Sequence, residues 1–277
     1  MAILCPDLNL LFIMVPGTGC SATGGVLTKE LGGRWVPEKD IIRDGRVVVG
    51  RKHCTLEQLL EHRLLPVRER DELLVVATVR NPFDRLVTYY QKLAGSRELN
   101  YAKASEKYLN RQRFEATLEE SVAREAFVKR TEQRMKRGAV LRRLGYRNWL
   151  MLNLARWRFR RRIRRPGLES PVHYEEAFPM LGGVDVAMRF ERLEDALNQV
   201  LRSRGHTSRV SIPHRNATRG KAAYSAYYGT LSRRLAERVL AHDLRLLGYT
   251  FDGPTSEDSV IHLRSSVEGI RGLSAAA

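Results

Sequence analysis

An unbroken apolar run followed at once by arginine and proline is the feature that most limits how this chain can fold. The run covers residues 73–79 (LLVVATV) and leads into Arg80, Asn81 and Pro82. A short β-branched run without alternation is typical of a strand buried on both faces, as in a parallel sheet. Proline suits the first turn of a helix, so we expect a helix over 82–94. The pattern therefore predicts an α/β fold, a parallel sheet flanked by helices.

The residues that follow this strand are suited to bind an anion. An arginine at the carboxyl end of a parallel strand, beside the N-terminus of a helix, can hold a phosphate. Arg80 has this position, and Thr88 follows it by eight residues, about two helical turns. We expect the Thr88 hydroxyl to join the same site, and Arg85 to pack outside it. The alternative is an Arg80 side chain that pairs only with a carboxylate such as Asp84.

A second unit of strand, loop and helix lies near the start of the chain. The apolar run 8–15 is followed by the small-residue stretch PGTGCSATGG at 16–25, and a helix is predicted over 21–31. Such a loop leaves backbone N–H groups available to an anion. The residues predicted to line it are Gly17, Thr18, Gly19, Cys20, Ser21 and Ala22. Two phosphate-type loops that each close a buried strand suggest one nucleotide held at two ends.

Two other nucleotide-binding motifs can be compared with this loop. Its glycines fit the spacing of the ATP-binding P-loop, but Gly25 and Val26 stand where that motif has lysine and a hydroxyl residue. The stretch 17–22 fits the G-x-G-x-x-A pattern of dinucleotide-binding folds, and Glu38 or Asp40 lies near the acidic position of that motif. Pro37 makes the segment before Glu38 a poor second strand. A Rossmann-type oxidoreductase and a plain tight turn therefore remain as alternatives.

Further strands and helices alternate along the chain. We expect strands at 46–49 and 184–190, and helices at 56–62, 193–203 and 232–247. Thr55 is a favourable N-cap for the helix at 56–62. In sheets built this way, ligands bind at the carboxyl ends of the strands, where both predicted anion sites lie.

The formal net charge of +17 is concentrated in one segment. Residues 136–165 contain twelve Arg and Lys and no Asp or Glu. Such a segment can form a nucleic-acid surface or, because Trp and Leu interrupt the arginines, a helix that lies on a membrane surface. A solvated face without a partner is the remaining alternative. We favour nucleic acid less than the other partners.

The length permits one or two domains, and we predict one soluble domain. We expect residues 1–277 to form a single unit that contains a helical basic insertion at 101–168 and ends in a flexible tail at 254–277. The apolar runs are shorter than the ~18 residues that span a bilayer, and no basic leader precedes the first of them. The three cysteines, Cys5, Cys20 and Cys54, have no metal-site spacing and suit a reducing compartment. The prediction is a cytoplasmic protein without a metal.

Together these units resemble the sulfotransferase family that uses 3′-phosphoadenosine 5′-phosphosulfate (PAPS), most closely its carbohydrate-type and bacterial branch. In that family a first loop holds the 5′-phosphosulfate, and a segment V-R-N/D-P-F-x-R-L-x-S-x-Y holds the 3′-phosphate. The chain has VRNPFDRLVTYY at 79–90, so Arg80 matches the family arginine and Thr88 keeps the hydroxyl of the serine. The segments FERL, IPHRN and LGYTF at 190–193, 212–216 and 247–251 also fit. The resemblance spans roughly residues 8–252.

The resemblance implies PAPS as the sulfuryl donor, bound by Gly17 to Ala22, Arg80 and Thr88, with no metal. The segment RKHC at 51–54 is similar to a K-H segment of the family, and we predict His53 as the general base. A neutral imidazole suits proton removal near neutral pH, and a neighbouring Lys52 disfavours the imidazolium. A structural or surface histidine is the alternative. Family members commonly carry Lys or Arg where this chain has Gly17, so the cation must come from elsewhere, with Arg51 and Lys52 as candidates.

The predicted function is transfer of a sulfuryl group from PAPS, by in-line displacement, to a hydroxyl or amine of a carbohydrate or lipid acceptor. The basic segment 136–165 would attract an anionic acceptor. Two alternatives stay open: a Rossmann-type oxidoreductase, and a catalytically weak anion- or nucleic-acid-binding protein on the same fold.

Overall fold

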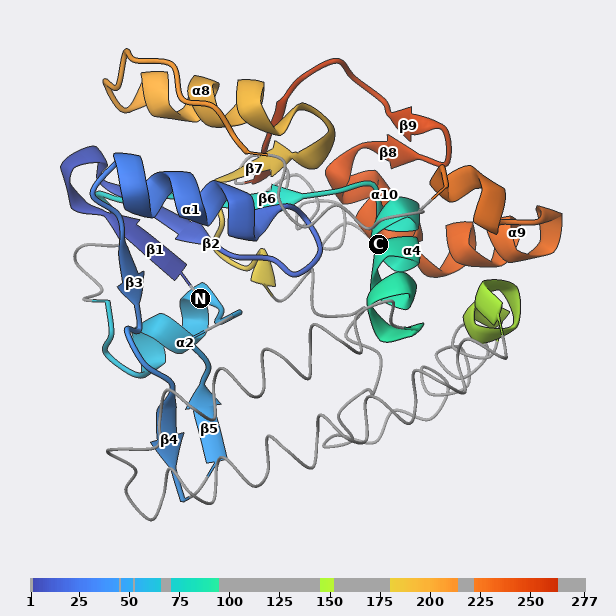
Figure 1. Ribbon diagram of the computed structural model, residues 1–277, viewed down its shortest axis with the longest axis horizontal. Helices are drawn as coiled ribbons and strands as arrows, with labels where there is room; N and C mark the ends of the chain where they lie inside the picture. Colours follow the sequence, from blue (N-terminus) through green and yellow to red (C-terminus); the bar gives the residue numbers. More distant parts are fainter. Residues whose placement is uncertain are drawn as a thin grey trace, which may run out of the picture.

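A six-stranded sheet organises the protein, in the order β10-β7-β6-β2-β1-β3 (Figure 1). The computed structural model describes residues 2–44, 46–51, 53–65, 71–94, 145–151, 180–213 and 222–263. The strands of this sheet are β1 (Ala2–Cys5), β2 (Leu10–Ile13), β3 (Arg34–Val36), β6 (Leu74–Val79), β7 (Val186–Arg189) and β10 (Val260–His262). The neighbouring strands β2, β6 and β7 are parallel, whereas β1, β3 and β10 pair in antiparallel fashion. The predicted α/β fold is confirmed, with a mixed sheet in place of a fully parallel one.

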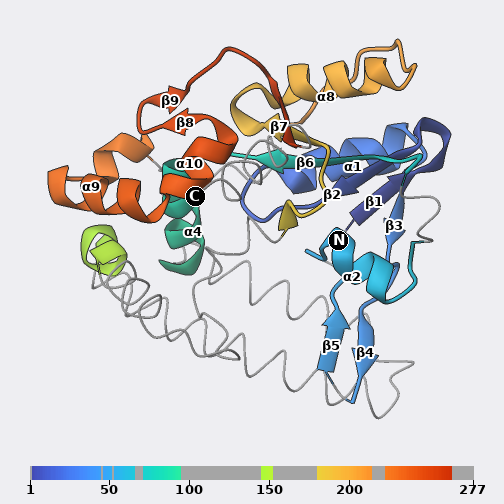
Figure 2. The ribbon, with the colours of Figure 1, turned by 180° about the vertical axis from the view of Figure 1, so that it is seen from behind.

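Helices cover both faces of the sheet. Successive side chains of a strand point to opposite faces, and both Leu11 and Phe12 of β2 are fully buried. The first face of the sheet packs against α1 (Cys20–Glu30) and α8 (Leu193–Ser203), and the second against α2 (Leu56–Glu61) and α10 (Ala241–Leu247) (Figures 1 and 2). The inner strands are apolar throughout because each lies between two cores.

Aromatic side chains join the remaining helices into a third core. The ring of Phe83, on α4 (Pro82–Ala94), meets the rings of Tyr228 and Phe251 edge-on, at centroid distances of 5.5 and 5.0 Å. The other elements beside this core are α9 (Thr230–Val239), η3 (Tyr224–Tyr227), β8 (Tyr249–Thr250) and β9 (Gly253–Pro254). The remaining elements are η1 (Pro6–Leu8), η2 (Phe190–Arg192) and the hairpin of β4 (Ile41–Arg43) with β5 (Arg46–Val49).

A short helical segment at 145–151 belongs to this aromatic core. Its Trp149 is only 4% exposed, and the ring of Tyr146 lies 5.1 Å from that of Tyr90 on α4. Trp149 is therefore a packing residue and not part of an exposed apolar face. The other residues of the predicted basic insertion at 101–168 lie outside the described residues.

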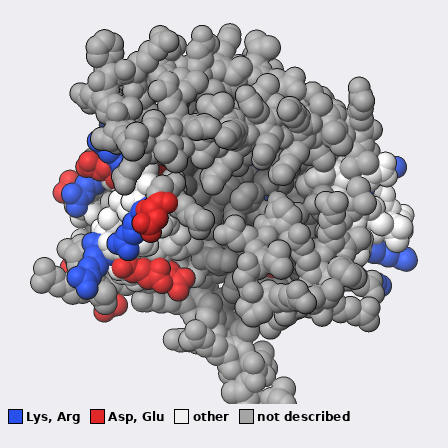
Figure 3. Space-filling view, turned by 90° about the horizontal axis from the view of Figure 1, so that it is seen from below, with Lys and Arg blue, Asp and Glu red and all other residues white. Residues whose placement is uncertain are grey.

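The described surface carries charges of both signs. On the face drawn in Figure 3, described Lys and Arg side chains lie among Asp and Glu side chains. Of the twelve basic residues between 136 and 165, the structure describes Arg147 alone, so the partners predicted for that segment stay predictions. No helix within the described ranges is both long enough and apolar enough to cross a membrane.

Several predicted elements are confirmed at or near their expected bounds. The strand predicted at 73–79 is β6, and the helices predicted at 82–94 and 193–203 are α4 and α8. Thr55 is the N-cap of α2, as predicted. Its hydroxyl accepts the N–H of Gln58 at 3.1 Å, and the Gln58 side chain accepts the Thr55 N–H at 3.0 Å, which completes a capping box.

Other predictions need correction. The strand predicted at 8–15 is shorter, because η1 precedes it, and β1 was not predicted. The helix predicted at 232–247 divides at Leu240, where ψ is 0°, into α9 and α10. The tail predicted as flexible from 254 is ordered as far as 263, since β10 joins the sheet and the Leu263 N–H donates to the Asp185 carbonyl at 2.9 Å. Pairing with a distant strand overrides the Gly- and Ser-rich composition there.

Candidate active site

The loop between β2 and α1 depends on two glycines. Gly17 and Gly19 both have φ of +82°, a left-handed conformation that favours glycine. Gly19 is also the N-cap of α1, and a Cβ atom there would lie 2.9 Å from side-chain carbons of Leu193 and Phe190. The loop therefore presents the N-terminus of an 11-residue helix, the part of a helix that attracts anions.

The other predicted loop residues divide into buried and exposed ones. Thr18 is 1% exposed, and its hydroxyl donates to the Val15 carbonyl at 2.8 Å and lies 2.5 Å from the Thr78 hydroxyl of β6. This hydroxyl thus anchors the loop to the sheet. The side chains of Cys20 and Ala22 are buried, whereas that of Ser21 is exposed.

Arg80 lies at the carboxyl end of β6, in contact with both the loop and α4. Its Nε donates to Asp84 Oδ2 at 2.6 Å and its Nη2 lies 2.5 Å from the same oxygen. Its Nη1 donates to the Gly17 carbonyl at 3.4 Å, and the guanidinium lies over the Phe190 ring, 4.0 Å from the centroid. The structure thus contains the Asp84 pair of the alternative interpretation and also brings Arg80 to the loop.

Thr88 lies on the same helix as Asp84, and its residue is 5% exposed. The helix positions Thr88 about two turns beyond Arg80, as the sequence indicates. Its role as a second phosphate ligand stays a prediction.

His53 lies beside the same loop, although it comes from a different part of the chain. Its Nδ1 is 2.8 Å from the carbonyl oxygen of Met14, two residues before Pro16. A carbonyl oxygen only accepts hydrogen bonds, so Nδ1 carries the proton and the neutral ring has its lone pair on Nε2. His53 has φ of +69°, an uncommon conformation for a residue other than glycine that is often associated with functional sites.

Of the two cations proposed in place of a loop lysine, the structure describes Arg51, which lies away from the loop. The guanidinium of Arg51 lies 5.6 Å from the centroid of the Trp35 ring in β3, a strand separated from β2 by β1. Lys52 lies outside the described residues. Its predicted influence on His53 therefore stays a prediction.

Arg85 contacts the loop, and the expectation that it packs outside the site is wrong. Its Nε donates to the carbonyl oxygen of Pro16 at 3.1 Å. A Cβ atom on Gly17 would lie 3.7 Å from Arg85 Cγ. The glycine at position 17 is a sequence signal that another cation is needed nearby. The sequence does not show that Arg85 supplies it, because the direction of this side chain depends on tertiary structure.

A partly buried polar network fixes the turn between β6 and α4. The Asn81 side chain accepts the N–H of Phe83 at 3.0 Å, and the Asn81 N–H donates to Glu191 Oε1 at 2.8 Å. The Tyr249 hydroxyl donates to the other oxygen of Glu191 at 2.7 Å. Burial, and then the charge of Glu191, raise the pKa of Tyr249, so this phenol is a neutral donor. The network holds the residues around Arg80 in place.

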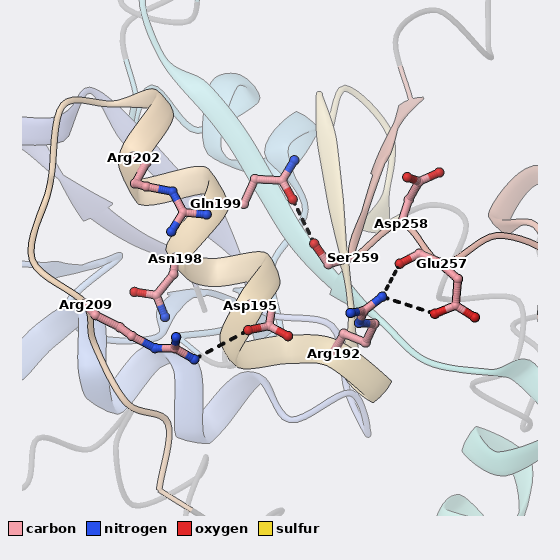
Figure 4. Close-up of a pocket in the computed structure, with 9 residues that line it drawn as sticks. All are labelled: Arg192, Asp195, Asn198, Gln199, Arg202, Arg209, Glu257, Asp258 and Ser259. Atoms are coloured by element: carbon pink, nitrogen blue, oxygen red, sulfur yellow. Dashed lines mark hydrogen bonds and ion pairs between the residues drawn. The ribbon is translucent and has the colours of Figure 1, made fainter.

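A polar hollow on the outer side of α8 is a separate feature (Figure 4). Two of its arginines pair with carboxylates: Arg192 with Glu257 at 3.2 Å, and Arg209 with Asp195 at 3.5 Å. Such mutually neutralised, exposed pairs do not by themselves indicate a ligand. Among the described residues no group of three or more His, Cys, Asp and Glu side chains could hold a metal ion.

The dinucleotide alternative does not fit this topology. In a Rossmann fold the helix after the glycine loop leads to a neighbouring parallel strand that ends in the acidic residue. Here α1 leads to the edge strand β3, which is separated from β2 by the antiparallel strand β1. Glu38 therefore does not follow a parallel strand that neighbours β2.

The arrangement combines a helix N-terminus, two arginines and an imidazole at the carboxyl edge of β2 and β6, which suits an anion and a proton acceptor side by side. A family model described as the sulfotransferase family matches residues 1–250. The matched region includes the glycine loop, His53 and the segment from Arg80 to Thr88. Comparisons with curated proteins and with solved structures found no match.

Proposed function

The chain belongs to the sulfotransferase family, and we propose that it transfers a sulfuryl group from PAPS to a hydroxyl or amine of an acceptor molecule. The observation that carries this proposal is the 2.8 Å contact between His53 Nδ1 and the Met14 carbonyl. This contact brings a candidate base beside the strand that leads into the glycine loop, although His53 and Met14 are 39 residues apart in the chain. That pairing is what transfer from a bound anion to a deprotonated oxygen requires.

The donor would bind at two ends. Backbone N–H groups of Thr18 to Ser21, at the N-terminus of α1, would hold the 5′-phosphosulfate. The N–H of Ala22, also predicted for this role, already donates to the Gly19 carbonyl at 2.9 Å. Arg80 and the Thr88 hydroxyl would hold the 3′-phosphate. Because Arg80 already pairs with Asp84, the 3′-phosphate would share this guanidinium with a carboxylate.

In the proposed reaction, Nε2 of His53 takes the proton from the acceptor hydroxyl. The acceptor oxygen forms a bond to sulfur as the bond from sulfur to the bridging oxygen of PAPS breaks in line. The electron pair of that bond stays on the leaving nucleotide, 3′-phosphoadenosine 5′-phosphate, and the proton later passes from His53 to solvent. The loop N–H groups stabilise the charge that develops on the leaving phosphate.

We propose a carbohydrate or lipid as the acceptor, with an anionic group that the basic segment 136–165 attracts. The support is the charge of that segment, twelve basic residues without an acidic one. Attraction of this kind weakens as salt is added, so acceptor affinity should fall steeply between low and physiological ionic strength. Acceptor affinity that does not depend on salt would contradict this part of the proposal.

A turnover assay with labelled PAPS and a panel of glycans, lipids and phenols tests the reaction. His53→Ala should lose transfer while still binding 3′-phosphoadenosine 5′-phosphate in calorimetry. His262→Ala, which changes an exposed histidine of β10, is the matched control and should keep full turnover. Full turnover by His53→Ala would remove His53 from the mechanism, and nucleotide binding without turnover of any acceptor would favour a binding protein on this fold.

A further inference from the structure

The loop at 16–25 contains no Lys or Arg. At Gly17, where the family commonly has one, the backbone conformation disfavours such a residue. Gly17 has φ of +82°, so a lysine there would hold a conformation that costs an L-residue roughly 1–2 kcal/mol. A positive charge near the donor must therefore come from a residue outside the loop.

Arg85 of α4 occupies the space beside Gly17. Its Cγ would lie 3.7 Å from a Cβ atom on Gly17, and its Nε donates to the Pro16 carbonyl at 3.1 Å. The Arg85 side chain thus runs beside the position that a side chain on residue 17 would occupy. It brings its guanidinium to Pro16, the first residue of the loop.

Arg80 and Arg85 hold two consecutive carbonyl groups of the loop. Arg85 binds the carbonyl of Pro16, and Arg80 binds that of Gly17. In a planar trans peptide the N–H points opposite to the C=O. The N–H groups of Gly17 and Thr18 are consequently directed away from the two arginines.

We propose that Arg85 is the positioning residue of the donor loop: it supplies the positive charge missing at Gly17 and orients the loop N–H groups toward the 5′-phosphate of the nucleotide. This inference rests on the proposed function. It assigns a role to Arg85, a different residue from Arg80, which matches the phosphate-binding arginine of the family. Arg85 acts through the loop and not by contact with the reacting atoms.

Asp243 on α10 lies near enough to this arginine to feel its charge. Burial raises the pKa of the Asp243 carboxyl, and the charges of Arg85 and His242 oppose that rise. Arg85 therefore lies within electrostatic range of α10 as well as in contact with the loop.

The test compares two nucleotides by calorimetry. Arg85→Met should weaken binding of adenosine 3′,5′-bisphosphate about tenfold, the value of one charge-assisted contact. It should leave adenosine 3′-phosphate, which lacks the 5′-phosphate, unchanged. Arg85→Lys keeps the charge and one donor, so it should restore most of the lost affinity. This variant carries the test if Arg85→Met does not fold.

Arg204→Met is the matched control. Arg204 also donates through Nε to a backbone carbonyl, that of Leu8 at 2.7 Å, but at the opposite end of β2. Its loss should change the affinity of neither nucleotide. Equal loss of both nucleotides in Arg85→Met, or no loss of the bisphosphate, would overturn the inference while leaving sulfuryl transfer intact. If the wild-type protein binds neither nucleotide, the proposed function itself fails and this inference fails with it.

Discussion

Replacement of Arg80 by glutamine is expected to remove binding energy from the 3′-phosphate end of the nucleotide alone. The guanidinium is held by Asp84 at 2.5–2.6 Å and by the Gly17 carbonyl at 3.4 Å, and it lies over Phe190. These contacts fix its position before a ligand binds. Glutamine keeps a polar end but loses the charge and the forked geometry.

Two terms set the size of the effect. A charge-assisted hydrogen bond contributes about 1.5–3 kcal/mol, which corresponds to roughly a 10- to 100-fold weaker affinity. The variant also leaves the Asp84 carboxylate without its arginine near a phosphate. At an effective dielectric constant of about 20, two like charges about 8 Å apart repel by ~2 kcal/mol. Together the two terms come to about 3.5–5 kcal/mol, so the loss in Arg80→Gln should exceed 100-fold.

A double-mutant cycle separates the two terms. Asp84→Asn alone should tighten binding of 3′-phosphoadenosine 5′-phosphate, and it should recover about 30-fold of the loss when combined with Arg80→Gln. Calorimetry with that nucleotide, and with adenosine 5′-phosphate as the ligand that lacks a 3′-phosphate, measures both effects. Arg192→Gln, an exposed arginine beyond β7, is the control protein. A folded Arg80→Gln variant that binds the bisphosphate with unchanged affinity would refute the assignment.

Three predictions concern stability, each measured by urea unfolding. Thr55→Ala should lower the free energy of unfolding by about 1 kcal/mol, because it removes the cap of α2; Thr55→Ser should lose much less. Gly19→Ala should lower it by more than the roughly 1–2 kcal/mol of a left-handed residue, because the new Cβ would also meet Leu193 and Phe190; an unchanged midpoint would contradict the loop geometry. Burial, and then Asp7, raise the pKa of Cys5 from 9.0 to about 11. Since the folded state prefers the neutral thiol, stability should fall as pH rises from 9 toward 11, by ~2 kcal/mol at most, and Cys5→Ala should lack this fall.

The elements that the sequence predicts well are those determined by local rules. The bounds of α4 follow from proline at its first turn, and the start of α2 follows from Thr55, whose capping box is present. β6 could be predicted because a strand buried on both faces has a short, unbroken apolar run. In each case the signal lies within a few residues of the element that it specifies.

Elements that depend on distant partners could not be predicted in this way. β1 and β10 are short, and each is a strand because of antiparallel pairing, to β2 and β3 and to β7 respectively. Their sequences, AILC and VIH, have too few residues to display a period. The division between α9 and α10 is likewise a tertiary effect, because both halves have helical sequences.

The candidate site shows the same limit at the level of single side chains. The loop glycines and Arg80 carry a recognisable spacing, whereas the left-handed backbone of His53 and its contact to Met14 arise only when β5 and β2 are folded. For Arg85, the sequence predicts the position on α4 but not the direction of the side chain. The side chain reaches Pro16 only because the loop passes the start of that helix.

The segment from Arg80 to Arg85 can be understood as six residues with separate physical tasks. Asn81 caps the helix, Pro82 begins it, Phe83 anchors it in the aromatic core, and Asp84 holds Arg80. The two arginines at its ends then hold consecutive carbonyls of the glycine loop. A loop fixed from outside in this manner can keep left-handed glycine where a lysine would otherwise stand. The absence of a loop cation is therefore compatible with donor binding, provided that both arginines remain.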